Sequence, residues 1–178
     1  LIEAFYAEQG FVAQATLPPQ EVVDGIVRID IIEAKFAGVQ FETSEPTRVR
    51  AELIRDYFEH FIPEGTTVRP AEFDLPNLLV NDLPGISVTG TFAPGRNPGE
   101  TILLLSSNEE PLLFGQALAD NFGSRATGRE RAVIQFGLNS PLGRGDLLRF
   151  DLTKSQGADG VTGSYAFPLG QEGARVSI

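Results

Sequence analysis

The sequence predicts an α+β chain in which β-α-α-β-β units are followed by antiparallel β-strands of a partial transmembrane β-barrel. Two observations lead to this fold class. Residues 129–175 alternate apolar and polar side chains in short runs separated by Gly- and Pro-rich turns, a pattern typical of a barrel wall with a wet lumen. Residues 36–106 instead place two amphipathic helices among β-branched strands. A soluble β-sandwich has the same alternation, so the period alone does not place the chain in a membrane.

The first 33 residues predict one helix and two strands. The helix covers Leu1–Gln9, with Ile2, Phe5 and Tyr6 on one face and Gly10 as its stop. The strands cover Phe11–Leu17 and Gly25–Glu33, and the turn region between them is marked by Pro18-Pro19-Gln20 and Asp24-Gly25. The second strand is rich in β-branched residues, which a half-buried strand prefers: Ile26, Val27, Ile29, Ile31 and Ile32.

The next segment predicts a complete β-α-α-β-β unit. A strand over Lys35–Glu42 precedes a helix whose apolar stripe consists of Val49, Leu53, Ile54, Tyr57, Phe58 and Phe61. A second helix begins near Asp74, which can cap it, tolerates Pro76 in its first turn and stops at Pro84-Gly85. Strands over Ile86–Phe92 and Glu100–Ser106 complete the unit. Residues 1–33 match its last α-β-β portion, so the chain contains a weak internal repeat.

In the C-terminal strands the alternation predicts which side chains share a face. We expect six residues to face lipid: Ile134, Phe136, Leu148, Phe150, Tyr165 and Phe167. We expect four to face the lumen: Gln135, Arg149, Asp151 and Ser164. Because such strands leave an apolar face bare and two sheet edges open, residues 112–178 are not expected to form a barrel wall by themselves in water.

Composition excludes several classes of function. The chain has no Cys, which removes disulfides, thiol nucleophiles and Cys-based metal sites. A net charge of −10 argues against nucleic-acid binding, and no Gly-rich phosphate loop with Lys indicates a nucleotide. No apolar run is long enough for a membrane-spanning helix. Because Met is absent and the alternation still continues at Ile178, we expect this chain to be a piece of a longer protein.

No set of side chains indicates an enzyme, so no catalytic, cofactor or metal residue is predicted. The only histidine, His60, lies at the end of an amphipathic helix and fits a surface position better than a base or ligand. The acid pairs Glu109 with Glu110 and Asp56 with Glu59 fit a solvated face of an acidic chain. Gly143-Arg144-Gly145-Asp146 contains an adhesion tripeptide, but a tight turn explains its glycines. Three acids lack the spacing of a calcium loop: Asp146, Asp151 and Asp159.

Eight short motifs, in this order along the chain, carry a resemblance to a known family: Tyr6–Phe11, Leu17–Gln20, Asp24–Val27, Leu79–Gly85, Asp120–Arg125, Thr127-Gly128, Leu138–Asp146 and Gly163–Gly170. With the β-α-α-β-β organisation, they resemble the two-partner secretion transporters, which are POTRA-plus-barrel proteins that export haemolysin- and filamentous-haemagglutinin-type proteins. Pro76 departs from the family pattern and should shorten the second helix. We expect most of the barrel, including the strand and loop with the family's Arg-containing motif, to lie outside these residues.

The resemblance implies three domains and a location. Residues 1–33 correspond to the C-terminal part of a first POTRA domain, residues 36–107 to a second POTRA domain, and residues 112–178 to the first strands of an outer-membrane β-barrel. It implies a bacterial outer-membrane protein with its POTRA domains in the periplasm. The implied partners are an unfolded secreted exoprotein and outer-membrane lipid.

The unit's topology predicts where that client binds. A three-stranded sheet in a β-α-α-β-β unit leaves the middle strand of the sequence at an edge, where an extended peptide can add by β-augmentation. We therefore predict a client-binding surface composed of Ile86, Val88, Gly90 and Phe92, the helix residues Leu78 and Leu79, and Phe11 and Ala13 of the first module. Two alternatives remain open: an insertase that assembles outer-membrane proteins, and a soluble β-rich interaction module.

Overall fold

The computed structural model describes residues 2–21 and 25–178, so the predicted helix start at Leu1 and the turn residue Asp24 lie outside the described residues. The chain forms two compact units. The first contains residues 1–44, 55–78 and 88–106, and the second contains residues 45–54, 79–87 and 107–178. Within the described residues, no helix is long and apolar enough to cross a membrane.

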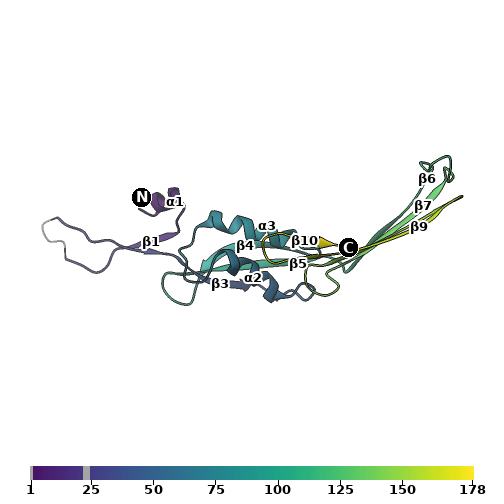
Figure 1. Cartoon of the computed structure of the whole chain (residues 1–178). Coiled ribbons are helices and arrows are strands. Elements are labelled where there is room, and N and C mark those ends of the chain that lie inside the picture. The colour runs from purple at the N-terminus through teal and green to yellow at the C-terminus, as the bar shows by residue number, and fades with distance from the viewer. Residues whose placement is uncertain (1, 22–24) are drawn as a thin grey trace. The chain divides into compact units, whose positions relative to one another are not determined.

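The N-terminal module has the predicted helix and strands, but both strands are shorter than expected. Helix α1 covers Ile2–Glu8 and is followed by Gly10, whose φ of 79° suits a helix stop. Strands β1 (Ala13–Thr16) and β2 (Asp30–Glu33) pair antiparallel as a two-stranded ribbon (Figure 1).

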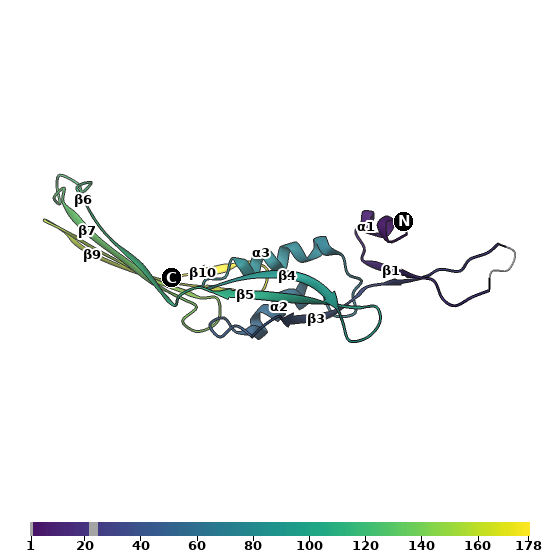
Figure 2. The same cartoon turned by 180° about the vertical axis from the view of Figure 1, so that it is seen from behind.

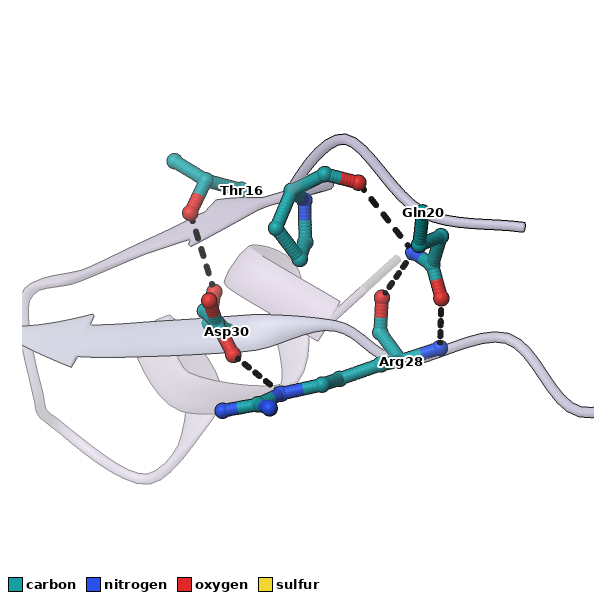
Figure 3. Close-up of polar contacts among 5 residues, drawn as sticks. Thr16, Gln20, Arg28 and Asp30 are labelled. Carbon is teal, nitrogen blue, oxygen red and sulfur yellow. Dashed lines mark hydrogen bonds and ion pairs between the residues drawn. The ribbon is translucent and has the colours of Figure 1, made fainter. Parts of the chain in front are cut away.

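Beyond the ends of these two strands a side chain continues the pairing. Gln20 accepts a hydrogen bond from the Arg28 amide and donates one to the Arg28 carbonyl, each at 2.7 Å (Figure 3). The Arg28 guanidinium also contacts Asp30 at 3.0 Å. The amide of Gln20 thus imitates the backbone of a paired strand residue.

The expectation of a half-buried β-branched strand over Gly25–Glu33 is wrong. Ile26 is 72% exposed, and Val27, Ile29, Ile31 and Ile32 are also exposed. The physical reason is that a two-stranded ribbon has no second layer, and burial requires one.

The predicted β-α-α-β-β unit is confirmed. Its strands are β3 (Lys35–Phe41), β4 (Ile86–Pro94) and β5 (Glu100–Glu109), and its helices are α2 (Ala51–Phe61) and α3 (Asp74–Asn81). A 3₁₀ turn, η1 (Pro70–Phe73), leads directly into α3, so Pro76 lies in the first turn of α3 as expected. Both helices lie alongside the strands (Figure 1).

The sheet order β3-β5-β4 places β4 at an edge, as the topology predicts. Strands β3 and β5 run parallel, with Phe36 opposite Thr101 and Phe41 opposite Leu105. Large apolar side chains of the first unit are buried: Phe36, Tyr57, Phe58, Ile62, Val68, Phe73, Val88, Leu103 and Leu105. Of the predicted stripe, Ile54, Tyr57 and Phe58 of α2 are buried, because their i, i+3, i+4 spacing puts them on one face. Val49 is also buried but precedes α2, and Leu53 and Phe61 are only half-buried.

The C-terminal strands form one antiparallel five-stranded sheet in the order β10-β9-β8-β7-β6. Its strands are β6 (Leu113–Asp120), β7 (Arg131–Asn139), β8 (Leu147–Ser155), β9 (Asp159–Pro168) and β10 (Arg175–Ser177) (Figure 2). Phe136 lies opposite Phe150, and Gln135 lies opposite Asp151. Since directly opposite residues share a face, the predicted grouping of side chains is confirmed, while their exposure to lipid or lumen stays a prediction.

The polar face of this sheet has a continuous hydrogen-bonded row. Gln116 donates to Gln135 at 2.6 Å, and Gln135 donates to Asp151 at 2.5 Å. On the other face the rings of Phe136 and Phe150 stack at 5.1 Å. The polar face is thus matched across three strands and the apolar face across two, which favours this register.

Candidate functional site

A groove of about 300 Å³ runs between the edge strand β4 and helix α3 in the first unit. Strand β4 contributes Val88, Thr89, Gly90 and Phe92. The opposite wall and the floor consist of Phe58, Pro70, Phe73, Asp74, Asn77 and Leu103. The lining is mostly apolar and adjoins a strand edge, a combination that suits an extended peptide with an apolar side chain.

Gly90 is the one residue without a side chain among those that line this groove. The alternation along β4 buries Ile86 and Val88 and exposes Ser87 and Thr89, so position 90 faces the core side. A Cβ at Gly90 would lie 2.9 Å from Leu103 Cδ1 and 3.3 Å from Leu105 Cδ2. Without a side chain, β4 has a notch in its own outline there, which the tips of Leu103 and Leu105 approach closely; such close approach is a frequent role of glycine within a strand.

Three aromatic rings form a connected wall beside the notch. Phe36 and Phe73 meet edge to face at 5.2 Å, and Phe73 and Phe92 do so at 4.9 Å. Phe73 itself is buried, whereas Phe92 is 38% exposed. Such pairs hold each ring in place, so this wall of the groove is ordered.

A second groove of about 270 Å³ in the same unit shares Phe92 with the first. It is lined by Val12, Ala13, Gln14, Ile32, Ala34, Phe92, Ala93, Pro94, Gly99, Glu100 and Thr101. Two backbone hydrogen bonds of 2.8 Å position its walls, from Ala34 to the Val12 carbonyl and from Val68 to the Ala34 carbonyl. The two grooves therefore meet at one aromatic side chain.

The charge at the second groove comes from Glu100. The Asn97 side chain donates to its carboxylate at 2.7 Å, and this hydrogen bond holds the pKa of Glu100 below its usual value. Glu100 is accordingly ionised at neutral pH. This end of the second groove therefore has a negative charge.

The structure brings some of the predicted binding residues together and separates others. Val88, Gly90 and Phe92 line the first groove, and Ala13 lines the second. The Arg69 guanidinium lies 4.7 Å from the Phe11 ring centroid. Leu78 is 66% exposed on α3 and Ile86 is buried, and neither lines either groove. Leu79 belongs to the second unit.

Sequence reasoning missed the groove residues contributed by other elements, chiefly Phe58, Phe73 and Leu103. Gly90 within a strand and an aromatic residue immediately before the Asp74 helix start were the available signals. Two of the residues considered for catalysis, His60 and Glu109, have structural partners. The ring of His60 packs on Phe61 at 4.9 Å, and Glu109 accepts hydrogen bonds at the start of α2. Among the described residues, no group of three or more acids and histidines is arranged to hold a metal ion.

Comparison with known proteins gives matches along most of the chain. Residues 99–177 match the family described as haemolysin secretion/activation protein ShlB/FhaC/HecB. The heme/hemopexin transporter protein HuxB of Haemophilus influenzae (strain 86-028NP) is 29% identical over 165 residues, covering 89% of this chain and 28% of the relative. The outer membrane transporter CdiB-2 of Burkholderia pseudomallei (strain 1026b) is 23% identical over 186 residues, covering 96% of this chain and 29% of that protein.

Solved structures show the same fold. CdiB from Escherichia coli superposes with a TM-score of 0.65 at 20% identity and covers 95% of this chain and 32% of its own. BamA from Haemophilus ducreyi lacking POTRA domains 1–3 superposes with a TM-score of 0.57 at 15% identity, covering 94% of this chain and 32% of its own. These likenesses confirm the predicted fold class. The chain spans less than a third of the length of each of these relatives.

Proposed function

We propose that this chain is part of a transporter. The matches confirm the premise of this proposal, which is that the chain resembles the two-partner secretion transporters in both sequence and fold. The protein acts in the bacterial outer membrane, with its POTRA domains in the periplasm. It binds an unfolded secreted protein there and passes it through a β-barrel to which strands β6–β10 contribute. The boundaries of the domains, residues 1–33, 36–107 and 112–178, are part of this proposal.

The observation that carries client capture is the notched edge strand β4. Within the described residues, β4 has a neighbouring strand on one side only, so an extended peptide could pair along the other side. Main-chain pairing tolerates varied sequences, which suits an unfolded client, and the notch at Gly90 adds selectivity for an apolar side chain. The second groove extends the surface to Ala13, so a longer extended segment can contact both modules of the first unit.

Translocation is supported by the two chemically distinct faces of the five-stranded sheet. The row of Gln116, Gln135 and Asp151 would line the lumen and give a translocating chain polar contacts. The opposite face, with Phe136 and Phe150, would contact outer-membrane lipid. No nucleotide or cofactor takes part in this proposal, and folding of the exported chain at the cell surface would supply the driving force.

The two alternatives have weaker support. The structural likeness includes BamA as well as CdiB, so fold alone does not separate an insertase from a secretion protein. The family matched by residues 99–177 is one of secretion and activation proteins, and the curated relatives are transporters. These descriptions favour secretion over membrane-protein assembly, over a soluble interaction module and over an enzyme.

The test fills the notch. Gly90→Val in the complete transporter places methyl groups where Leu103 Cδ1 now limits the space, and this leucine tip can rotate, so the fold is retained. We expect affinity for the unfolded secreted partner, measured by calorimetric titration, to fall about tenfold, which corresponds to about 1.4 kcal/mol. Thr91→Val on the exposed face of β4 is the matched control and leaves affinity unchanged. Equal affinity for both variants would contradict capture at this groove.

A further inference from the structure

The β6–β7 loop, residues 121–130, lies at one end of the five-stranded sheet (Figure 2). Only residues 110–112 separate β5 from β6, so β6 begins next to the β-α-α-β-β segment in the chain and ends at this loop. Strands β6–β9 contain 8 to 10 residues each, about the length that crosses a bilayer when tilted. In the proposed transporter the β-α-α-β-β segment is periplasmic, so one crossing by β6 places the loop at the cell surface.

The apolar face of the sheet ends just before this loop. One row across β6–β9 on that face is entirely apolar: Ala117, Ile134, Leu152 and Val161. The next row toward the loop consists of Ala119, Ala132, Lys154 and Asp159. Its two charged side chains form an ion pair of 2.7 Å. Because a change from apolar to charged side chains marks the edge of a lipid-facing band, the loop begins at the level of the lipid headgroups.

The backbone of the loop is held by hydrogen bonds. The Phe122 amide donates to the Asp120 carboxylate at 3.0 Å, and the Gly123 amide donates to the Arg129 carbonyl at 2.9 Å. A Cβ on Gly123 would lie 2.8 Å from that carbonyl oxygen, so the close approach needs glycine. The Thr127 carbonyl accepts a further bond of 2.8 Å from the β8–β9 turn. The loop therefore has a defined conformation.

Phe122 points its ring into solvent from this fixed backbone. It is 82% exposed, the largest value of any phenylalanine among the described residues. Transmembrane barrels have aromatic residues at both membrane–water interfaces, where an apolar ring can enter the lipid layer. The position and the exposure of Phe122 suit such a contact.

Two arginines of the loop have no ion-pair partner among the described residues. Arg125 and Arg129 are both exposed. Arg131, at the start of β7, is in contrast paired with Asp120 at 2.7 Å. The only acid of the loop, Glu130, is exposed and accepts a hydrogen bond of 3.4 Å from a side chain of the β8–β9 turn. Two guanidinium groups are thus available to an anion.

The charge at this end of the sheet differs in sign from that of the chain. Residues 120–131 and 154–159 contain four cations, Arg125, Arg129, Arg131 and Lys154, and three acids, Asp120, Glu130 and Asp159. The whole chain has 14 Lys and Arg against 24 Asp and Glu. A locally cationic surface on an acidic protein favours an anionic partner at that place.

We propose that the β6–β7 loop binds the phosphate-bearing headgroup of a membrane lipid, with Arg125 and Arg129 on the phosphate and Phe122 in the apolar layer beneath it. The inference rests on the proposed function, because that function places the loop at the outer surface of the membrane. A guanidinium matches a phosphate with two parallel hydrogen bonds, and the ring removes its exposed surface from water. The site would hold the β6–β7 hairpin at a fixed depth.

The test uses the complete transporter in phosphatidylcholine vesicles with or without lipid A, a lipid whose headgroup bears phosphate. A nitroxide label at the exposed position Ala126→Cys reports depth through collisions with lipid-soluble oxygen and a water-soluble nickel chelate. These residues contain no other Cys, and any Cys elsewhere in the transporter is replaced first. The test variants are Arg125→Gln with Arg129→Gln, and Phe122→Ser. The control, Arg96→Gln with Arg144→Gln, removes the same charge from exposed positions outside the loop.

We expect lipid A to move the label deeper in the parent and in the control. Its affinity, titrated through this shift, should fall about thirtyfold in the double arginine variant. Each arginine near an anionic surface contributes about 1 kcal/mol, and about 1.4 kcal/mol is tenfold. High salt should weaken the response of the parent. Phe122→Ser should still respond to lipid A but leave the label at a shallower depth.

Four results would overturn the site: no response of the parent to lipid A, an equal loss of affinity in the control, an unchanged label depth in Phe122→Ser, or inorganic phosphate that competes as tightly as lipid A. The last result would indicate a site for phosphate rather than for lipid. Client export, assayed in the same vesicles, separates this inference from the proposed function. Export without a response to lipid A contradicts the lipid site alone, whereas a response without export contradicts the transport function alone.

Discussion

At the scale of single residues, Glu109 fixes the start of α2. Its carboxylate accepts hydrogen bonds from the amides of Thr47 and Arg48 and from the Thr47 hydroxyl, the first at 2.8 Å and the last at 2.9 Å. These amides lie in the turn that leads into α2, which begins at Ala51. A glutamate from a distant strand thus holds the segment that precedes the helix.

This role makes stability depend on pH. Burial raises the pKa of Glu109, but the hydrogen bonds from Arg48 and Thr47 outweigh burial and leave the pKa below its usual value of 4.5. A lowered pKa in the folded state means that the contribution is fully present above pH 4.5 and is lost as pH falls through the folded value. We expect Glu109→Gln to lower the free energy of unfolding by about 1 kcal/mol at neutral pH, the usual net contribution of a hydrogen bond.

The measurement is thermal unfolding followed by helix circular dichroism from neutral to acidic pH. The difference in unfolding temperature between the parent and Glu109→Gln should become smaller as the solution becomes more acidic than pH 4.5. Glu172→Gln, at an exposed position, serves as the control and should follow the parent throughout. A difference in unfolding temperature that stays constant from neutral to acidic pH would show that the carboxylate charge does not stabilise α2.

Asp146 marks the limit of prediction at this scale. The glycines of Gly143-Arg144-Gly145-Asp146 correctly indicated a tight turn, and both glycines have positive φ. The burial of Asp146 could not be predicted, because it depends on the Tyr165 hydroxyl from a later strand. The conformation of a tight turn depends on residues that are neighbours in the sequence. The burial of a carboxylate depends on contacts with residues that are distant in the sequence and that only the fold brings close.

At the scale of elements, periodicity predicted the strands and helices that have a covered face. Strand β4 was placed correctly at a sheet edge from the order of the elements. The stripe of α2 was placed in the core because its spacing reflects burial against a second layer. Strand β2 was predicted too long and too buried, because its β-branched residues signal strand propensity but not the presence of a covering layer. The β4 groove could be predicted only as an edge, since its opposite wall comes from η1, α3 and β5.

The two faces of the five-stranded sheet give an element-scale prediction. Phe150 stacks on Phe136 on the apolar face, whereas Thr153 lies opposite Val133 on the face of Gln135 and Asp151. In the complete transporter we expect Phe150→Arg to cost about 2–4 kcal/mol if the position lies near mid-membrane. Thr153→Arg should have almost no effect on assembly of the barrel. Heat-modifiability on gels after membrane extraction reports assembly, and the reverse ranking would defeat the assignment of faces.

At the scale of the whole molecule, the compact units are not continuous in sequence. Residues 45–54 and 79–87 group with the C-terminal strands rather than with the rest of the β-α-α-β-β segment. A motif order along the chain cannot reveal this grouping, because it arises from loop-to-turn contacts such as that between Ser140 and Pro84. The predicted domain boundaries remain a prediction based on the family resemblance.

The last prediction concerns this chain in water. Large apolar side chains stay exposed on one face of the five-stranded sheet, with Leu113 at 63%, Ile134 at 48% and Val161 at 74%. The edge strands β6 and β10 also have an open side within the described residues. Contiguous apolar surface and open edges drive association, so we expect light scattering to show assemblies in detergent-free buffer and a single species once detergent covers that face. A monodisperse monomer without detergent, with slowly exchanging amides throughout residues 130–178, would contradict the membrane assignment and favour a soluble β-domain.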